Sequence, residues 1–367
     1  MTSRGLPPPR IAIAFQGDAT DPDSWSGVPA GLWRGLRGAG FEPVAIDARF
    51  PGYSQLAHRL RMSWAEATAN PLFAQGAGFV AGRAATRADI AGAVTIGSGF
   101  ALPARLRSVT FEDMTVAQAV RQPDSIYSQL GSAAVARWEG RQRRIYQRSR
   151  ACCVTSGWAA RSLREDYGVS GGKVHVVGLG RNVDVDPVRR DWSTPRFLFV
   201  GLDWERKRGA EVLDGLAFVR RHYPGATLDL VGGHPPIEAA GVTGHGRLPL
   251  GSPEGRRRYA ELLARSTCFL MPSRFEPYGI AYLDAAGAGV ASIGTTVGGA
   301  SDAIGDCGRL VDPGDPRGLF EAMLELADPT TARQLGEKAR ARSCQLTWRK
   351  VSERVAKALD LAASGGG

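Results

Sequence analysis

The 367-residue sequence has no long hydrophobic run, only five cysteines and only five lysines. No apolar stretch approaches the roughly 18 residues that a membrane-spanning helix requires, so we expect no integral membrane segment. The first residues lack the apolar region of a secretory signal, which favours a cytoplasmic protein. No two cysteines show the C-x-x-C spacing of a metal or redox site, so we expect reduced thiols, consistent with the cytoplasm.

Because lysine is scarce, arginine carries nearly all of the positive charge. The formal net charge of +10 by itself favours a nucleic-acid ligand. The arginines are spread along the chain, however, with short clusters only at 137–150 and 255–259. We therefore expect no nucleic-acid partner. An anionic small molecule such as a phosphate compound needs only a few of these charges.

The motifs of several enzyme classes are missing. The sequence contains no P-loop GxxxxGK[ST] and no GxSxG elbow, and the glycine patterns at 97–102 and 178–183 lack the third small residue of a dinucleotide fingerprint. The five histidines never occur at metal-ligand spacing. We therefore expect neither a cofactor nor a metal.

What the sequence does contain is a regular alternation of short apolar runs and helical stretches. A polar segment at 181–195 interrupts this alternation, which restarts with the apolar run 196–201. The pattern predicts an α/β fold of two Rossmann-like doubly wound domains, at residues 1–185 and 190–345. The carboxyl ends of the two sheets would face one cleft, where such sheets bind ligands.

A loop after the strand at 196–201 carries three consecutive cations. Arg206, Lys207 and Arg208 precede a helix that we expect to begin near Gly209. Cations between the carboxyl end of a strand and a helix N-terminus suit a diphosphate, because charge, free N–H groups and the helix dipole coincide there. A solvated basic loop is the alternative interpretation.

Two acids, Glu276 and Asp284, flank a second predicted turn from a strand to a helix. We expect the helix to begin near Tyr278 and the backbone N–H groups of Gly279 and Ile280 to form an anion site. Eight residues span about two helical turns, so both carboxylates can fall on roughly the same side. Acids beside an anion site are acceptors for hydroxyl groups, such as those of a sugar and a ribose.

These residues resemble the E-x7-E motif of the retaining GT-B glycosyltransferases, family four. The stretch 272–315 is similar to the nucleotide-sugar site of that family, and 24–44 to its N-terminal glycine loop and first helix. Residues 347–355 resemble its C-terminal helix, expected at 346–363, which packs back on the first domain. The resemblance implies transfer of a sugar from a nucleoside diphosphate sugar, with UDP preferred, to an acceptor that the sequence does not identify.

The resemblance also implies roles for individual residues of the second domain. Glu276 would contact hydroxyls of the donor sugar, and Asp284 would hold the ribose. Lys207, with Arg206, would neutralise the diphosphate, and the turn 278–280 would bind its oxygens. With the acceptor attacking from the side of the leaving group, a phosphate oxygen would receive the proton.

Three further positions complete the implied site. Gly27 would let the backbone approach the phosphates, and Leu248 would border the base. Asp113, with its neighbour Glu112, occupies the loop in which related enzymes often place a histidine or an acid near the sugar. Asp113 is thus the third candidate catalytic residue beside Glu276 and Lys207.

The sequence departs from the family pattern at specific positions. Asp284 is one methylene shorter than the usual glutamate, and Leu202 stands where many relatives carry an arginine. A shift of one residue in the alignment with the family decides whether Lys207 or Arg208 takes the place of the usual lysine.

Two other functions stay open: a GT-B nucleotide-sugar epimerase or hydrolase, and a non-catalytic partner subunit. The sequence predicts no oligomeric state.

Overall fold

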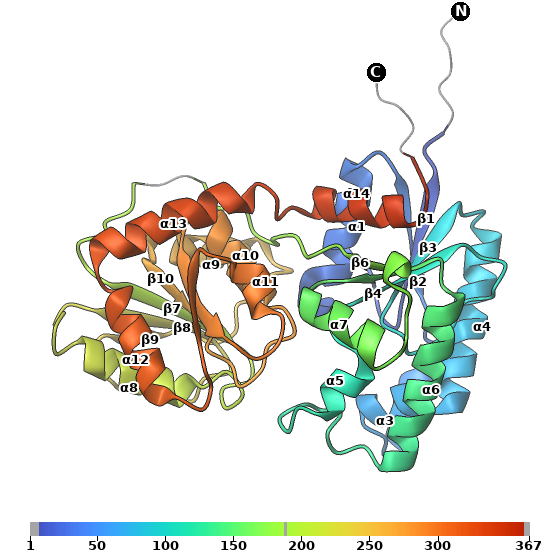
Figure 1. Ribbon diagram of the computed structural model, residues 1–367, viewed down its shortest axis with the longest axis horizontal. Helices are drawn as coiled ribbons and strands as arrows, with labels where there is room; N and C mark the ends of the chain where they lie inside the picture. Colours follow the sequence, from blue (N-terminus) through green and yellow to red (C-terminus); the bar gives the residue numbers. More distant parts are fainter. Residues whose placement is uncertain (1–6, 187–188, 363–367) are drawn as a thin grey trace, which may run out of the picture. The chain divides into compact units, whose positions relative to one another are not determined.

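The computed structural model describes residues 7–186 and 189–362, which form two compact units. The first unit contains the described residues up to Gly178 and again from Trp348 onward, and the second contains Leu179–Thr347. Each unit holds one six-stranded sheet with only parallel pairings, flanked by helices (Figure 1). This confirms the predicted α/β fold with two parallel sheets.

The sheet of the first unit has the strand order β2-β1-β3-β4-β5-β6. Its strands are β1 (Arg10–Phe15), β2 (Glu42–Asp47), β3 (Gly92–Ile96), β4 (Ser108–Glu112), β5 (Ala151–Val154) and β6 (Val174–Val176). The run 11–14 on β1 is fully buried, as expected for a parallel strand covered on both faces. The strand order reverses between β1 and β3, so the loops after these strands diverge at a topological switch point.

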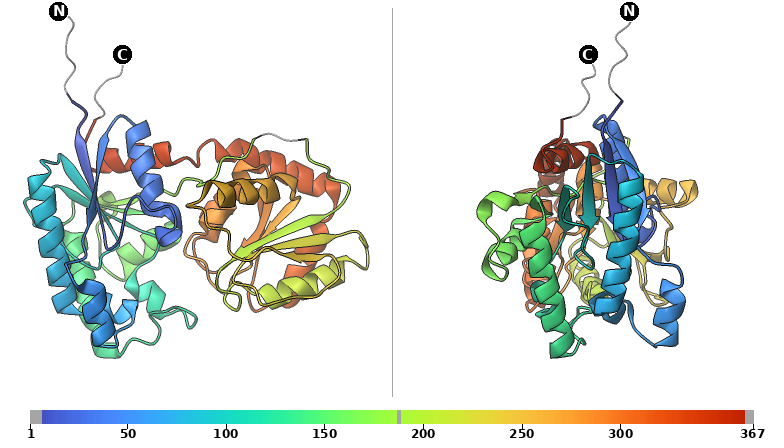
Figure 2. Two further views of the ribbon diagram at one scale, coloured as in Figure 1. Left: turned by 180° about the vertical axis from the view of Figure 1, so that it is seen from behind. Right: turned by 90° about the vertical axis from the view of Figure 1, so that its right-hand side faces the viewer.

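Small residues allow the helices of the first unit to pack closely. Figure 2 shows the long helices α4 (Pro71–Arg87), in blue, and α6 (Ser132–Arg148), in green. Ala77, Ala81 and Ala85 lie on one face of α4 and pack in one cluster with alanines of β1.

The other helical segments of the first unit are η1 (Ser24–Gly27), α1 (Val28–Gly38), α2 (Tyr53–Arg59), α3 (Trp64–Ala69), α5 (Val116–Val120), α7 (Gly157–Glu165), η2 (Gly171–Lys173) and α14 (Trp348–Ala358).

The C-terminal helix α14, red in Figure 1, lies against α1. Glycines on α1 make this contact possible: a Cβ at Gly31 would lie 2.1 Å from the indole ring of Trp348, and one at Gly35 would lie 2.3 Å from the Trp348 carbonyl oxygen. The hydroxyl of Ser352 donates to the carbonyl of Leu32 at 3.4 Å. The end of the chain is therefore part of the first unit.

The second unit has the strand order β12-β11-β10-β7-β8-β9. Its strands are β7 (Arg196–Gly201), β8 (Thr227–Gly232), β9 (Val242–Gly244), β10 (Cys268–Leu270), β11 (Ala291–Thr295) and β12 (Gly308–Val311). Its helices are α8 (Gly209–Val219), α9 (Pro253–Arg265), α10 (Ile280–Gly287), α11 (Ala300–Ile304), α12 (Pro316–Glu325) and α13 (Pro329–Ser343). The switch point lies between β7 and β10, so the loops after these strands emerge at the same edge of the sheet.

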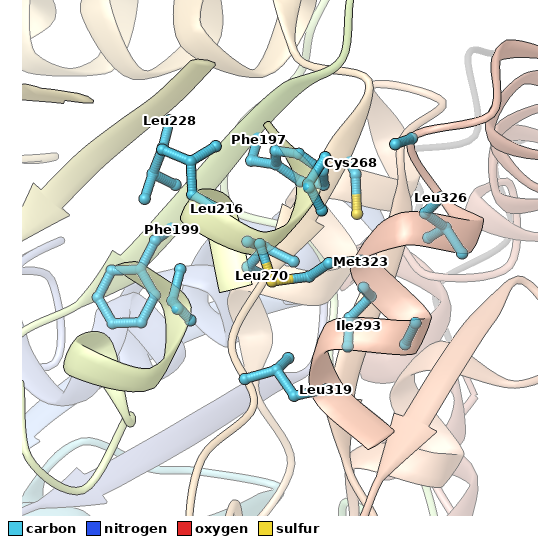
Figure 3. Close-up of a cluster of buried hydrophobic side chains, with 14 of the residues drawn as sticks. Phe197, Phe199, Leu216, Leu228, Cys268, Leu270, Ile293, Leu319, Met323 and Leu326 are labelled. Carbon is cyan, nitrogen blue, oxygen red and sulfur yellow. The ribbon is translucent and has the colours of Figure 1, made fainter. Parts of the chain in front are cut away.

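One face of this second sheet forms a hydrophobic core with α8 and α12. Phe197, Leu270 and Ile293 from the strands pack with Leu216 and Met323 from the helices (Figure 3). Burial of each such side chain contributes about 1.5–3 kcal/mol. This core fixes the positions at which β7 and β10 end, and with them the loops that follow.

Candidate functional site

The loops after β7 and β10 are joined to each other. The backbone N–H of Arg274 donates to the carbonyl of Arg206 at 2.7 Å. The Arg206 side chain donates in return from Nη1 to the carbonyl of Phe275 at 2.9 Å, and its guanidinium lies 5.1 Å from the centre of the Phe275 ring. Two segments almost 70 residues apart in sequence thus form one surface.

Glu276 is the centre of this surface, and cations surround it. Its Oε2 accepts a hydrogen bond from Nζ of Lys207 and lies 3.7 Å from Nη1 of Arg206. The hydroxyl of Ser273 lies within 3.3 Å of the same oxygen. The structure therefore brings together Arg206, Lys207 and Glu276, three residues that the sequence predicts for one site.

The pair of Lys207 and Glu276 is buried: the two residues are 8% and 7% exposed. Burial lowers the pKa of Lys207, and the charge of Glu276 opposes that shift. A buried charge of this kind needs its partner, because removal of one member leaves the other uncompensated in a medium of low dielectric constant. Nζ of Lys207 also lies 3.0 Å from the sulfur of Met271, a weak acceptor.

The backbone of Glu276 is held by a glycine-containing loop after β11, inside the stretch 272–315 but with no role predicted for its residues. The N–H of Glu276 donates to the carbonyl of Val297, and the N–H of Gly299 donates to the carbonyl of Glu276. Gly298 has φ 109°, and a Cβ there would lie 2.1 Å from the Glu276 carbonyl oxygen. The consecutive glycines Gly298 and Gly299 were the signal that could have revealed this contact.

The helix after Glu276 begins later than predicted. Gly279 has φ 84°, outside the right-handed helical region, so α10 begins at Ile280 rather than near Tyr278. A Cβ at Gly279 would lie 2.4 Å from the ring of Tyr282. The first N–H groups of α10 follow this glycine directly, as the predicted anion site requires.

Asp284 lies on α10, is 2% exposed, and is held by the backbone of another segment. Its Oδ1 accepts hydrogen bonds from the N–H groups of Asn182 at 2.7 Å and Val183 at 3.1 Å. Burial raises the pKa of Asp284 to about 7, although the two N–H groups act in the opposite direction. The sequence did not predict these partners, and the contact of Asp284 with a ribose stays a prediction.

Arg208, the third cation of the loop, contacts Glu211 rather than Glu276. It precedes α8 in a left-handed conformation with φ 60°, and its side chain is 1% exposed. Its Nε lies 3.3 Å from Glu211, while both terminal nitrogens are buried and have no hydrogen-bond partner among the described residues. Lys207, not Arg208, is therefore the residue that contacts Glu276.

Two further positions that the sequence analysis named follow strands of the second sheet, β7 and β9. Leu202 directly follows β7 and is 64% exposed. Leu248 is half-buried and lies two residues after Gly246. The carbonyl of Gly246 accepts a hydrogen bond from the N–H of Gly232 at the end of β8, and the N–H of Gly246 donates to the ring of His234. The β8–β9 connection is thus fixed at the same edge as the cationic loop.

In the first unit, Gly27 stands at the start of α1 with φ 75°. The two residues before it, Trp25 and Ser26, also have positive φ values of 41° and 54°, which side chains other than glycine rarely adopt. The buried Gly27 is the last residue of this left-handed run before the helix.

Glu112, at the end of β4, is more deeply buried than its neighbour Asp113. Its Oε2 accepts a hydrogen bond from the hydroxyl of Tyr146 and lies 3.5 Å from Nε2 of Gln142. The same Nε2 donates to the hydroxyl oxygen of Ser98 at 2.5 Å. Its Oε1 is buried and has no partner among the described residues. Burial raises the pKa of Glu112 to about 7. The raised pKa distinguishes Glu112 as an acid of this loop, and the catalytic role of Asp113 stays a prediction.

Two features are absent from the described residues. Within 7–186 and 189–362 there is no group of three or more His, Cys, Asp or Glu residues that could hold a metal ion. Within the same ranges, no helix combines the length and the apolar character that crossing a bilayer demands.

Part of the second unit matches a known enzyme family. Residues 194–328 match the family described as "Glycosyl transferases group 1". This range contains Arg206, Lys207, Glu276 and Asp284, so the cationic cluster lies inside the matched segment.

Two curated proteins are similar to parts of the chain. N-acetyl-alpha-D-glucosaminyl L-malate synthase of Bacillus anthracis is 42% identical over 84 residues, which is 22% of this chain and 22% of that protein. Glycogen synthase of Mycobacterium tuberculosis is 30% identical over 190 residues, which is 46% of this chain and 43% of that protein. The matched part of the chain spans less than half the length of either relative.

Two solved structures are similar to the whole chain. Sucrose-phosphate synthase from Thermosynechococcus elongatus gives a TM-score of 0.67 at 17% identity, covering 95% of this chain and 98% of that one. WaaG, described as a glycosyltransferase involved in lipopolysaccharide biosynthesis, gives 0.64 at 15% identity, covering 98% and 100%. These similarities confirm the predicted GT-B fold of two Rossmann-like domains. The family match and the relatives support a glycosyltransferase.

Proposed function

We propose that the protein is a retaining glycosyltransferase that moves a sugar from a nucleoside diphosphate sugar, preferably a UDP-sugar, to an acceptor. The observation that carries this proposal is the cluster of Glu276, Lys207 and Arg206 at the switch point between β7 and β10. Ligands bind at the carboxyl ends of parallel strands, at such a switch point. The cluster combines cations with a hydroxyl acceptor, as recognition of a sugar diphosphate requires.

In this proposal the cations stabilise the leaving group. Lys207 and Arg206 neutralise the charge that develops on the diphosphate, and the N-terminus of α10 adds N–H donors. These groups take the place of a metal ion, and no cofactor is required. The acceptor attacks from the side of the leaving group, so that its oxygen bonds to the anomeric carbon as the diphosphate oxygen leaves. A phosphate oxygen receives the proton.

Glu276 has two tasks in the same mechanism. Its carboxylate binds donor hydroxyls, and its charge opposes the lowering of the pKa of Lys207 by burial. Asp284 and Leu248 are proposed to contact the ribose and the base. Gly27 and Asp113 of the first unit are proposed as further contacts to phosphate and sugar on the basis of the family resemblance.

The cellular setting follows from the same proposal. The described cysteines, including the buried pair Cys152 and Cys153, are all free, which favours a reducing compartment such as the cytoplasm. The partners would be the donor and its acceptor, with no nucleic acid involved.

A screen of nucleotide sugars by thermal shift is the first experiment, because a ligand that binds the native state raises the melting temperature. The donor found is then incubated with candidate acceptors, and the anomeric configuration of the product is determined by NMR. Retention supports the proposal and inversion contradicts the mechanism. An epimer or free sugar formed without acceptor would instead indicate an epimerase or hydrolase. A protein that binds neither UDP nor GDP in calorimetric titration would be a non-catalytic subunit.

A further inference from the structure

A groove of about 610 Å³ lies in the first unit between α4 and α6. The first turns of α4, the loop 101–103 after β3 and the middle of α6 line it, and both helices can be followed in Figure 2. All of its lining residues belong to the first unit, whereas the cluster of Glu276, Lys207 and Arg206 belongs to the second. The groove and the cluster are therefore built from different residues.

Three arginines on one face of α6 give the groove its charge. Arg137, Arg141 and Arg144 follow each other at intervals of four and three residues, which places them on neighbouring turns of the same helix face. No acidic residue is among the residues that line the groove. The groove is thus strongly cationic, in a segment that the sequence analysis noted only as a cluster of arginines.

The three arginines differ in how they are held. Arg141 donates to the carbonyls of Thr68 and Ala69, while its Nε is buried and has no partner among the described residues. Burial and the nearby charge of Arg144 lower the pKa of Arg141 to about 10. Arg137 and Arg144 are exposed and form no ion pair within residues 7–186 and 189–362. Like charges at this spacing repel each other, and a bound anion would relieve that repulsion.

Apart from Gln75, the rest of the lining is apolar and consists mostly of alanine, glycine and proline. Gly78 allows the loop to approach α4, since a Cβ there would lie 2.6 Å from the carbonyl oxygen of Ala101. At Gly140 a Cβ would meet only the guanidinium of Arg144 at 3.7 Å, so the space above it is open. Phe79 is 69% exposed at the groove, and Leu102 adds a half-buried apolar surface. An occupant would therefore place an anionic group on the arginines and an apolar body against the small residues.

We propose that this groove binds a molecule that carries a phosphate or carboxylate group on an apolar body. Arginine suits such anions because its planar guanidinium donates two parallel hydrogen bonds. A soluble phosphomonoester and an anionic lipid headgroup share this chemistry. The volume lies within the range of pockets that hold small organic ligands.

Calorimetric titration with phenyl phosphate and with inorganic phosphate tests the groove. Phenyl phosphate should bind more tightly, because only it can bury an apolar body. The double substitution Arg137→Gln/Arg144→Gln should weaken its binding about tenfold or more, and Gly140→Leu should block it by filling the open space. Arg148→Gln, on the exposed end of the same helix but outside the groove, is the control for removal of an arginine from this helix and should bind as the parent does.

A second arm distinguishes the two sources of the anion. Co-sedimentation with phosphatidylcholine vesicles, with and without phosphatidylglycerol, is measured for the same variants. Vesicle binding that Gly140→Leu and the double substitution abolish, but Arg148→Gln does not, assigns the groove to a lipid headgroup. Binding of phenyl phosphate alone assigns it to a soluble ligand.

The failure of this inference can be told apart from failure of the proposed function. Phenyl phosphate should still bind to Lys207→Ala and in the presence of saturating UDP. The inference is overturned if neither probe binds, if UDP or Lys207→Ala abolishes binding, or if all variants bind like Arg148→Gln. Circular dichroism confirms that each variant is folded, and the exposed arginines provide variants that leave the core intact.

Discussion

Each unit contains a buried glutamate near the carboxyl end of a central strand, and the two glutamates have opposite surroundings. Glu276 of the second unit contacts Lys207 and lies near Arg206. Glu112 of the first unit has the neutral partners Tyr146 and Gln142, and burial together with the charge of Asp113 raises its pKa to about 7. The comparison shows that the α/β fold by itself does not determine whether a buried carboxyl group at the end of a strand is charged. Neighbouring cations make one carboxylate part of an ion pair, whereas burial without cations favours the protonated acid.

The largest effect is expected at the cationic partner in the second unit. Lys207→Ala should lower turnover about 10²- to 10³-fold, because it removes a preorganised cation from the leaving group. It should also reduce the free energy of unfolding by about 3–5 kcal/mol, since Glu276 would stay buried without its partner. Steady-state kinetics and urea unfolding measure the two effects.

A double variant separates catalysis from stability. Lys207→Ala/Glu276→Gln leaves no unpaired buried charge, so it should recover much of the lost stability but none of the activity. Recovered activity in the double variant would contradict the role of Lys207 at the diphosphate. Equal stability of the single and double variants would contradict the ion pair.

The second-largest effect is expected at Glu112 of the first unit, as a dependence of the free energy of unfolding on pH. The pKa of Glu112 is raised in the folded state, so the native protein binds its proton more tightly than the unfolded chain does. The contribution of Glu112 to the free energy of unfolding is therefore complete below about pH 4.5. This contribution is lost as the pH rises towards 7. The parent should therefore lose up to about 3 kcal/mol more than Glu112→Gln over that interval, measured by urea unfolding at several pH values.

Asp284→Asn provides the comparison for this experiment. The pKa of Asp284 is also raised to about 7, so its own pH-dependent loss should persist in Glu112→Gln and disappear only in Asp284→Asn. Identical pH profiles of the parent and Glu112→Gln would show that Glu112 is charged in the folded state.

A smaller effect is expected where the backbone holds Glu276. Gly298→Ala places a Cβ against the Glu276 carbonyl at a φ of 109°, so we expect a loss of about 1–3 kcal/mol. Because the clash displaces Glu276, donor binding should weaken as well. Gly225→Ala, where a Cβ would make only an ordinary contact with Thr194 at 3.7 Å, is the matched control and should bind the donor normally.

The smallest effect is expected for Asp284→Asn at pH 6. Near this pH the carboxyl is largely protonated, and an amide oxygen can still accept from Asn182 and Val183. The stability should change by less than about 1 kcal/mol. Unfolding at pH 6 measures it, and a large loss would mean that the charged carboxylate holds the segment 182–183.

Much of the fold followed from local pattern. Continuous apolar runs on β1 and β7 predicted buried parallel strands, and the cations before Gly209 correctly marked the start of α8. The start of α10 was misplaced because Gly279 adopts a left-handed conformation with φ 84°, so that the helix begins only at Ile280.

The candidate site was predictable only in part. Its residue types and their order along the chain indicated Lys207 and Glu276, but the choice between Lys207 and Arg208 stayed open. It depends on the left-handed conformation of Arg208, which turns that side chain into the interior. Likewise, the partners of Asp284 lie about 100 residues earlier in the chain, so no spacing rule reveals them.

The sequence by itself determined two parallel sheets, the cationic loop and the acids beside a helix start, because these features depend on neighbouring residues. The tertiary structure decided which acidic groups form ion pairs and which have neutral partners. It paired Glu276 with a lysine 69 positions away and left Glu112 with neutral partners. The physical reason is that the free energy of a charge depends on burial and on nearby groups in space, and both arise only once the strands are side by side.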